Sequence, residues 1–152
     1  MDKPKIQVGE AVPKFSLKNQ HGELISIENF IGKSFVIYFY PKDDTPGCTV
    51  EACAFRDAFE DFQNLGAAVI GISGDSPEAH QKFAKKYALP FVLLSDPKNE
   101  VRSLFGVPKS LFGLLPGRVT YIVDEMGKVK HIFGGQFQAR KHVREAMTSL
   151  KK

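Results

Sequence analysis

The length, composition and charge of the chain exclude several classes of protein. A chain of 152 residues that is 43% hydrophobic and 25% charged has the composition of a globular protein rather than a disordered one, and we expect residues 1–152 to form one domain. The net charge of +4 is mild and the lysines are spread along the sequence, so no nucleic-acid partner is expected. The longest apolar run, at 35–40, is far shorter than the roughly 20 residues that span a bilayer, so no membrane partner is expected.

The first part of the chain predicts a hairpin, a buried strand and a helix. Polar and apolar residues alternate over 13–18 and again over 24–27, with a His-Gly turn between them, which is typical of a β-hairpin. Residues 34–40 are almost continuously apolar and rich in β-branched and aromatic side chains, which indicates a strand buried on both faces. Apolar residues then recur at helical spacing over 49–65, and Gly66 ends this helix.

The second part of the chain continues the alternation of strands and helices. The expected segments are a strand over 67–73, a helix with Ser76 as its N-cap, a strand over 91–94, a short helix over 99–105, a Gly- and Pro-rich loop over 106–117, a strand pair over 118–123 and 128–133, and a helix over 139–150. A right-handed βαβ crossover followed by an antiparallel hairpin and a helix predicts an α/β, thioredoxin-like fold. Its mixed central β-sheet would be flanked by helices and extended by the N-terminal β-hairpin.

The two cysteines, Cys48 and Cys53, are only five residues apart. Two cysteines are too few for a disulfide-built scaffold, and a chain of this length does not need one. A disulfide that closed so short a loop would contribute little loop-closure stabilisation. We therefore expect the pair to have a chemical role rather than a structural one.

Cys48 follows a Pro-Gly turn and falls in the first turn of the predicted helix. Unpaired backbone N–H groups and the positive end of the helix dipole favour a thiolate at such a position. A thiolate attacks the O–O bond of a peroxide and becomes a sulfenic acid, and Thr45 lies near enough in sequence to orient a peroxide oxygen. The polar and turn-forming neighbours predict that the site is exposed at a loop, whereas the alternative is an inert buried thiol.

Other polar residues carry weaker signals. The pattern favours solvent-exposed positions for Glu51 and Arg56 on the predicted helix, and for Asp43 and Asp44 in the loop before it. Arg118, at the start of a predicted strand, is equally compatible with a surface position and with a role beside the cysteine. The sequence predicts neither a metal nor a cofactor, because it has no phosphate-binding glycine loop and its histidines lack metal-ligand spacing; these are His21, His80, His131 and His142.

The stretch PKDDTPGC matches the Pro-x-x-x-Thr-x-x-Cys signature of peroxiredoxins, and the chain resembles that family. The second cysteine in CTVEAC makes it similar to the peroxiredoxin Q group, also called bacterioferritin comigratory proteins. The resemblance covers nearly the whole chain, and LFGLLPGRVTYIVD looks more like the plant-plastid and cyanobacterial members than the usual enteric ones. It implies a catalytic set made of Pro41, Thr45, Cys48 and Arg118, with Cys53 as the resolving cysteine.

The resemblance also implies partners and a reaction. The expected substrate is a hydroperoxide, and a thioredoxin-like reductant is expected to reduce an intramolecular Cys48–Cys53 disulfide. The motifs of dimeric, overoxidation-sensitive peroxiredoxins are missing, so a monomer is expected.

The N-terminus has no apolar signal-peptide core, which predicts a cytoplasmic protein, or a plastid protein if a transit peptide was removed before Met1.

The disulfide has a geometric requirement. Positions five apart in an ideal helix have Cα atoms about 8.6 Å apart, whereas a disulfide needs them within about 7 Å. The first turns of the helix are therefore expected to unwind on oxidation.

Two other classes of protein remain open. One is a thiol–disulfide oxidoreductase acting on proteins, which would normally carry CxxC. The other is a non-enzymatic module whose cysteines sense oxidants or pack in the core.

Overall fold

The computed structural model describes residues 6–107, 109–110, 115–135 and 138–151. Its elements in chain order are β1 (Ser16–Asn19), β2 (Leu24–Ser26), the 3-10 helix η1 (Ile27–Phe30), β3 (Ser34–Phe39), α1 (Pro46–Asp57), α2 (Phe59–Asn64), β4 (Ala67–Ser73), α3 (Pro77–Tyr87), β5 (Val92–Ser95), α4 (Glu100–Phe105), β6 (Lys109–Ser110), β7 (Leu115–Pro116), β8 (Val119–Val123), β9 (Val129–Gly134) and α5 (Ala139–Lys151). Within these ranges no helix is both long and apolar enough to cross a membrane.

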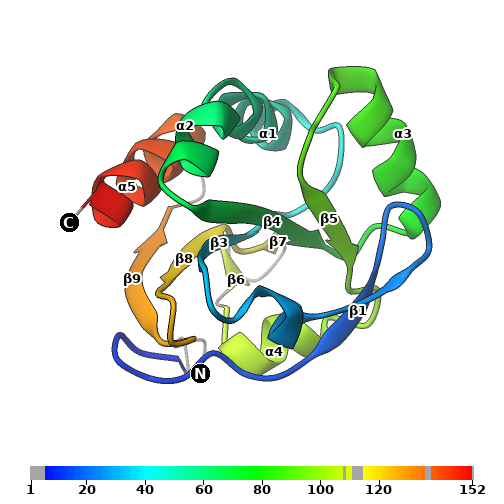
Figure 1. The fold of residues 1–152 in the computed structure, drawn as a ribbon. Helices are drawn as coiled ribbons and strands as arrows, with labels where there is room; N and C mark the ends of the chain where they lie inside the picture. The colour runs from blue at the N-terminus through cyan, green and yellow to red at the C-terminus, as the bar shows by residue number, and fades with distance from the viewer. Residues whose placement is uncertain (1–5, 108, 111–114, 136–137, 152) are drawn as a thin grey trace.

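Seven of the strands form one mixed sheet in the order β2-β1-β5-β4-β3-β8-β9 (Figure 1). The central strands β3, β4 and β5 are parallel, because a helical crossover joins each to the next. At one edge β8 pairs antiparallel with β3 and β9 pairs antiparallel with β8, and at the other β1 of the hairpin β1–β2 pairs antiparallel with β5. The expected mixed sheet with an N-terminal hairpin is confirmed.

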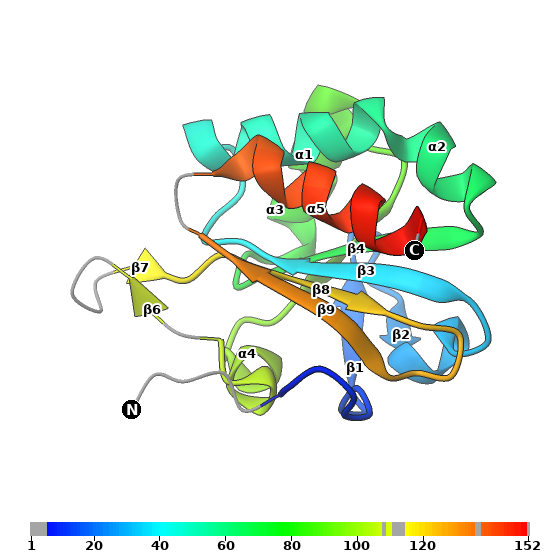
Figure 2. The same ribbon diagram turned by 90° about the vertical axis from the view of Figure 1, so that its left-hand side faces the viewer.

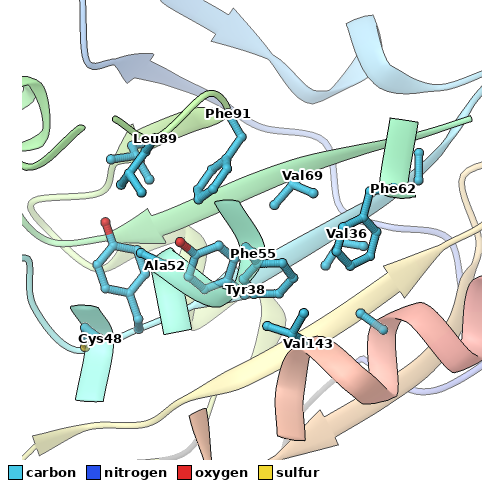
Figure 3. Close-up of a cluster of buried hydrophobic side chains, with 14 of the residues drawn as sticks. Val36, Tyr38, Cys48, Ala52, Phe55, Phe62, Val69, Leu89, Phe91 and Val143 are labelled. Carbon is cyan, nitrogen blue, oxygen red and sulfur yellow. The ribbon is translucent and has the colours of Figure 1, made fainter. Parts of the chain in front are cut away.

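The helices cover both faces of this sheet. Helices α1, α2, α3 and α5 lie over one face, and α4 lies under the other (Figure 2). On the first face the rings of Tyr38 from β3 and Phe55 from α1 stack with their centroids 4.5 Å apart, in a buried cluster that includes Cys48 (Figure 3). On the second face Phe105 of α4 packs on Phe39 and Tyr121, at centroid distances of 5.0 and 4.9 Å. Side chains of β3 therefore contact helices on both faces of the sheet.

The predicted helix over 49–65 differs from the structure at its start and in the middle, while its predicted end before Gly66 agrees with the C-cap at Leu65. It begins earlier, at Pro46, whose fixed φ and missing N–H suit the first helical position. It is also interrupted at Ala58, where φ of −95° and ψ of 1° leave the helical region and separate α1 from α2. The predicted loop over 106–117 contains the short pair β6–β7, although residues 108 and 111–114 of it lie outside the described residues.

Candidate active site

The start of α1 places Cys48 where the sequence predicts it. Thr45 is the N-cap residue, with φ of −91° and ψ of 156°, and its carbonyl accepts the first helical hydrogen bond from the Thr49 N–H at 2.8 Å. Cys48 therefore lies in the first turn, among backbone N–H groups that an α-helix leaves without internal partners. These groups and the positive end of the helix dipole attract negatively charged groups.

Cys48 is nevertheless buried, and the expectation of an exposed site was wrong. Its side chain is only 1% exposed. Cys48, Ala52 and Phe55 are spaced by four and three residues, so they share one face of α1, and that face packs on the sheet (Figure 3). The turn-forming neighbours Pro46 and Gly47 are the part that faces solvent. A thiolate in the interior needs a positive charge beside it.

Arg118, just before β8, provides that charge. Its Nη2 donates a hydrogen bond to Cys48 Sγ at 3.3 Å, and its side chain is buried, so the alternative of a surface arginine was wrong. The approach is close, since a Cβ on Gly47 would lie 3.1 Å from Nη2. Burial opposes the charge of Arg118, but the charges of Glu51 and Cys48, together with the hydrogen bonds to both groups, raise its pKa.

Glu51 is a member of the site that the sequence interpretation missed. It was expected to face solvent, but its side chain is fully buried, and Arg118 Nη1 donates a hydrogen bond to its Oε1. Its Oε2 has no hydrogen-bond partner among the described residues and lies 3.7 Å from Nδ1 of His142. Burial raises the pKa of Glu51 to about 8, although Arg118 acts in the opposite direction. The one signal was its position three residues after Cys48, on the inward face of the helix.

His142 of α5 closes the site behind Glu51. It is fully buried, its Nε2 donates to the Gly135 carbonyl at 2.8 Å, and its Nδ1 lies 2.7 Å from the hydroxyl of Thr120. Burial lowers the pKa of His142 to about 4. The imidazole is therefore neutral near pH 7, and Arg118 is the charged partner of Glu51.

Pro41 and Thr45 lie in the loop that joins β3 to α1. Both are partly buried, and the Thr45 hydroxyl donates to the Lys42 carbonyl at 2.8 Å. This hydrogen bond lies within the loop. The structure thus puts Pro41 and Thr45 in the segment that enters the site, while it brings Cys48 and Arg118 into contact.

The same loop is tied to α3 by a buried polar cluster. Asp43, expected to face water, is buried instead; it accepts a hydrogen bond from the Tyr40 hydroxyl at 2.6 Å, and its other oxygen is 2.6 Å from Nδ1 of His80. Asp44 is exposed as expected and accepts from Lys86 of α3 at 2.8 Å. The cluster was missed because its partners come from distant segments of the chain.

Three potential metal-ligand atoms, from one histidine and two aspartates, meet in this cluster. Atoms of Asp43, Asp75 and His80 lie within 4.8 Å of one another. They bond to the protein itself: Asp75 Oδ2 accepts from the Asp43 N–H at 2.8 Å, and His80 Nε2 lies 3.0 Å from the Leu94 carbonyl. The arrangement braces the loop, and the absence of a metal stays a prediction.

Cys53 lies on the other side of α1 from Cys48. It is half-buried, it is a free thiol like Cys48, and it lines a surface groove of about 500 Å³ together with Asp57 and Arg140 of α5. Because both cysteines belong to one unbroken helix in this reduced state, the separation of about 8.6 Å expected for helical Cα atoms applies. Unwinding before disulfide formation stays a prediction.

Comparison with known proteins agrees with this geometry. Residues 8–132 match the sequence profile of the AhpC/TSA family. A relative named "Peroxiredoxin Q, chloroplastic" from Populus jackii is 54% identical over 146 residues, which cover 96% of this chain and 68% of the relative. The crystal structure of peroxidoxin BcpB from Mycobacterium tuberculosis matches with a TM-score of 0.88 at 34% identity, over 96% of this chain and 97% of that one. A bacterioferritin comigratory protein from Xanthomonas campestris matches with a TM-score of 0.85 at 28% identity, over 98% of both chains.

The fold and the site together define a cysteine-based redox protein with a thioredoxin-like fold, as the sequence predicts. The chain belongs to the AhpC/TSA family, within its group of peroxiredoxin Q and bacterioferritin comigratory proteins. The resemblance found in PKDDTPGC and CTVEAC is thereby confirmed.

Proposed function

We infer that the chain is a thiol-dependent peroxidase that reduces hydrogen peroxide and organic hydroperoxides and so protects against oxidants. The observation that carries this function is the hydrogen bond of 3.3 Å from the Arg118 guanidinium to Cys48 Sγ, at the N-terminus of a helix, in a chain of this family. The similar protein from Xanthomonas campestris is described as having alkyl peroxide reduction activity, which supports organic hydroperoxides as substrates here.

In the proposed reaction Cys48 is the peroxidatic residue. Its thiolate attacks one oxygen of the hydroperoxide, so that an S–O bond forms as the O–O bond breaks. The products are the sulfenic acid and an alkoxide or hydroxide, which takes up a proton and leaves as alcohol or water. Arg118 stabilises both the thiolate and the negative charge on the leaving oxygen, because its donors are already in place. Thr45 orients the peroxide, and Pro41 shapes the entrance.

Cys53 is the proposed resolving residue. Its thiol attacks the sulfenic sulfur, a disulfide forms and water leaves. A dithiol reductant of the thioredoxin type then exchanges with this disulfide and restores both thiols while it becomes oxidised itself. The half-buried position of Cys53 beside the groove supports attack from outside.

The setting of the enzyme is proposed in the same way. Residues 1–152 are proposed to form one domain that works as a monomer, because both cysteines lie on one helix and need no second subunit. The compartment is proposed to be a plastid or the cytoplasm, and the name of the plant relative, which is chloroplastic, supports the plastid.

Titration of the two thiols with hydrogen peroxide tests this function. The wild-type protein should lose both thiols rapidly and stoichiometrically, and its mass should fall by two hydrogens. Slow loss of thiols would favour the alternative of cysteines that merely pack, and reduction of insulin without consumption of peroxide would favour a protein oxidoreductase.

Two variants separate the proposed roles of the cysteines. Cys48→Ser should abolish peroxide reduction, because a hydroxyl is not ionised near pH 7 and cannot attack the O–O bond. Cys53→Ser should complete one turnover, stop at the sulfenic acid and become prone to further oxidation. The readout is peroxide consumption with and without thioredoxin. Sustained thioredoxin-linked turnover by the Cys53 variant would refute the resolving role.

A further inference from the structure

Arg102 of α4 is a buried cation that the proposed reaction does not use. Its side chain is 7% exposed, and arginine is rarely buried so deeply unless it is paired. Its guanidinium binds two backbone carbonyls: Nη1 donates to Gly117 at 2.7 Å, and Nη2 donates to Tyr40 at 3.0 Å. One planar group thus joins two segments that are far apart in the sequence.

Both carbonyls belong to residues that immediately precede the site. Tyr40 comes directly before Pro41, where the loop to Cys48 begins. Gly117 comes directly before Arg118. The position of either carbonyl therefore affects where the guanidinium of Arg118 meets the sulfur.

The sheet itself does not hold these segments together. Backbone pairing of β3 with β8 ends at the pair Phe39–Val119, next to Tyr40 on the first strand and next to Arg118 on the second. Pro41 has no N–H and cannot extend the ladder. The side chain of Arg102 supplies hydrogen bonds between the two strand ends at the point where the ladder stops.

The helix that carries Arg102 is firmly seated. The carboxylate of Asp96, itself buried, accepts hydrogen bonds from the backbone N–H groups of Val101 and Arg102, at 3.2 and 3.0 Å. The guanidinium carbon of Arg102 lies 5.6 Å from the centroid of the Phe39 ring, within the range of a cation–π contact. Because Asp96 fixes the backbone of Arg102 and Phe39 contacts its guanidinium, this side chain has little freedom to move.

Arg102 is also positively charged. Burial lowers its pKa to about 10, while the charges of Asp96, Tyr121 and Cys48 act in the opposite direction. It therefore remains protonated at neutral pH. A thiolate at Cys48 thus interacts with this second cation as well as with Arg118.

We propose that Arg102 is a positioning residue of the peroxidase: by holding the carbonyls of Tyr40 and Gly117 together, it fixes the place at which Arg118 contacts Cys48. This inference rests on the proposed function. It assigns Arg102 no contact with the peroxide.

The test compares Arg102→Lys with Arg102→Met. A lysine keeps the charge but lacks the planar fork that spans two carbonyls. We expect Arg102→Lys to lower the second-order rate constant for hydrogen peroxide about tenfold, because small misplacements of a reacting group are costly. The pH at which Cys48 becomes reactive toward an alkylating agent should stay at its wild-type value in this variant. In Arg102→Met the rate constant should fall further, and that pH should rise because a charge is lost.

Val101→Ala is the matched control, since Val101 is buried in the same helix but bonds to neither carbonyl. It should lower the melting temperature and leave the rate constant and the alkylation profile unchanged. If Arg102→Lys behaved in the same way, Arg102 would have only a structural role and the proposal would be overturned. An inactive wild-type protein would instead refute the proposed function.

Discussion

Among single residues, Arg118 and Cys48 carry the proposed reaction through their contact. A buried thiolate is unfavourable without a nearby cation, and Arg118 Nη2 lies 3.3 Å from the sulfur. Arg118→Met should therefore lower the second-order rate constant for peroxide and raise the pH at which Cys48 becomes reactive, by the loss of one charge. Stopped-flow peroxide kinetics and the pH profile of alkylation measure the two effects.

Arg56→Met is the control for this prediction. Arg56 also lies on the helix of the site, but its side chain is partly exposed and donates to the Tyr87 carbonyl at 2.8 Å. Its loss should leave both quantities unchanged. An Arg118 variant with wild-type kinetics and a wild-type alkylation profile would contradict the role assigned to that guanidinium.

The buried carboxyl of Glu51 predicts a dependence of stability on pH. Its pKa is about 8 in the folded protein, against 4.5 for the ordinary group. A group with a raised folded pKa stabilises the fold below pH 4.5, and this contribution is lost as the pH rises through 8. The free energy of unfolding should therefore decline between pH 5 and 8 by an amount on the order of a few kcal/mol.

Glu51→Gln should flatten this decline, because glutamine does not ionise. Urea unfolding at a series of pH values provides the measurement. A decline of the same size in the variant and in the wild-type protein would mean that another group causes it.

Helix α1 is expected to change its structure when the proposed disulfide forms. The cysteines are on one helix, and the distance of about 8.6 Å between their helical Cα atoms exceeds the limit of about 7 Å for a disulfide. Oxidation should melt the start of α1, with the loss of a few backbone hydrogen bonds worth about 1 kcal/mol each. Hydrogen exchange should show loss of protection from Cys48 to Phe59 in the oxidised protein.

The rest of the fold should keep its protection. Strands β3 and β4 are central in the sheet, and the loop before α1 is tied to α3 through Asp43 and His80. These segments are the internal control of the exchange experiment. Equal protection of α1 in both redox states would show that the disulfide forms without unwinding.

For the molecule as a whole, the placement of both cysteines on one helix predicts a monomer in both redox states. The disulfide partner of Cys48 is on its own chain, five residues away. Sedimentation of the reduced and oxidised protein should give the mass of one chain. A disulfide-linked dimer on a non-reducing gel after stoichiometric peroxide would contradict this prediction.

Most of the fold could be predicted from the sequence, because the alternation of buried strands and amphipathic helices is a local pattern. The position of Cys48 in the first turn of a helix was predictable for the same reason. The burial of Glu51 and Asp43 was not, because each is buried by a partner distant in sequence: Arg118 is 67 residues from Glu51, and His80 is 37 residues from Asp43. Charged residues in a helix or loop are usually exposed, and only tertiary contacts reverse that expectation.

The interruption at Ala58 has a consequence for the reduction potential. Because α1 ends at Asp57 and α2 begins at Phe59, the unwinding expected on oxidation can stop near this break and leave the rest of α2 intact. The helical structure of α1 then favours the dithiol over the disulfide. Any substitution that stabilises α1 by about 1.4 kcal/mol should make the potential about 30 mV less negative. The stability of one short helix would thus set how readily the reductant returns the enzyme to its reduced state.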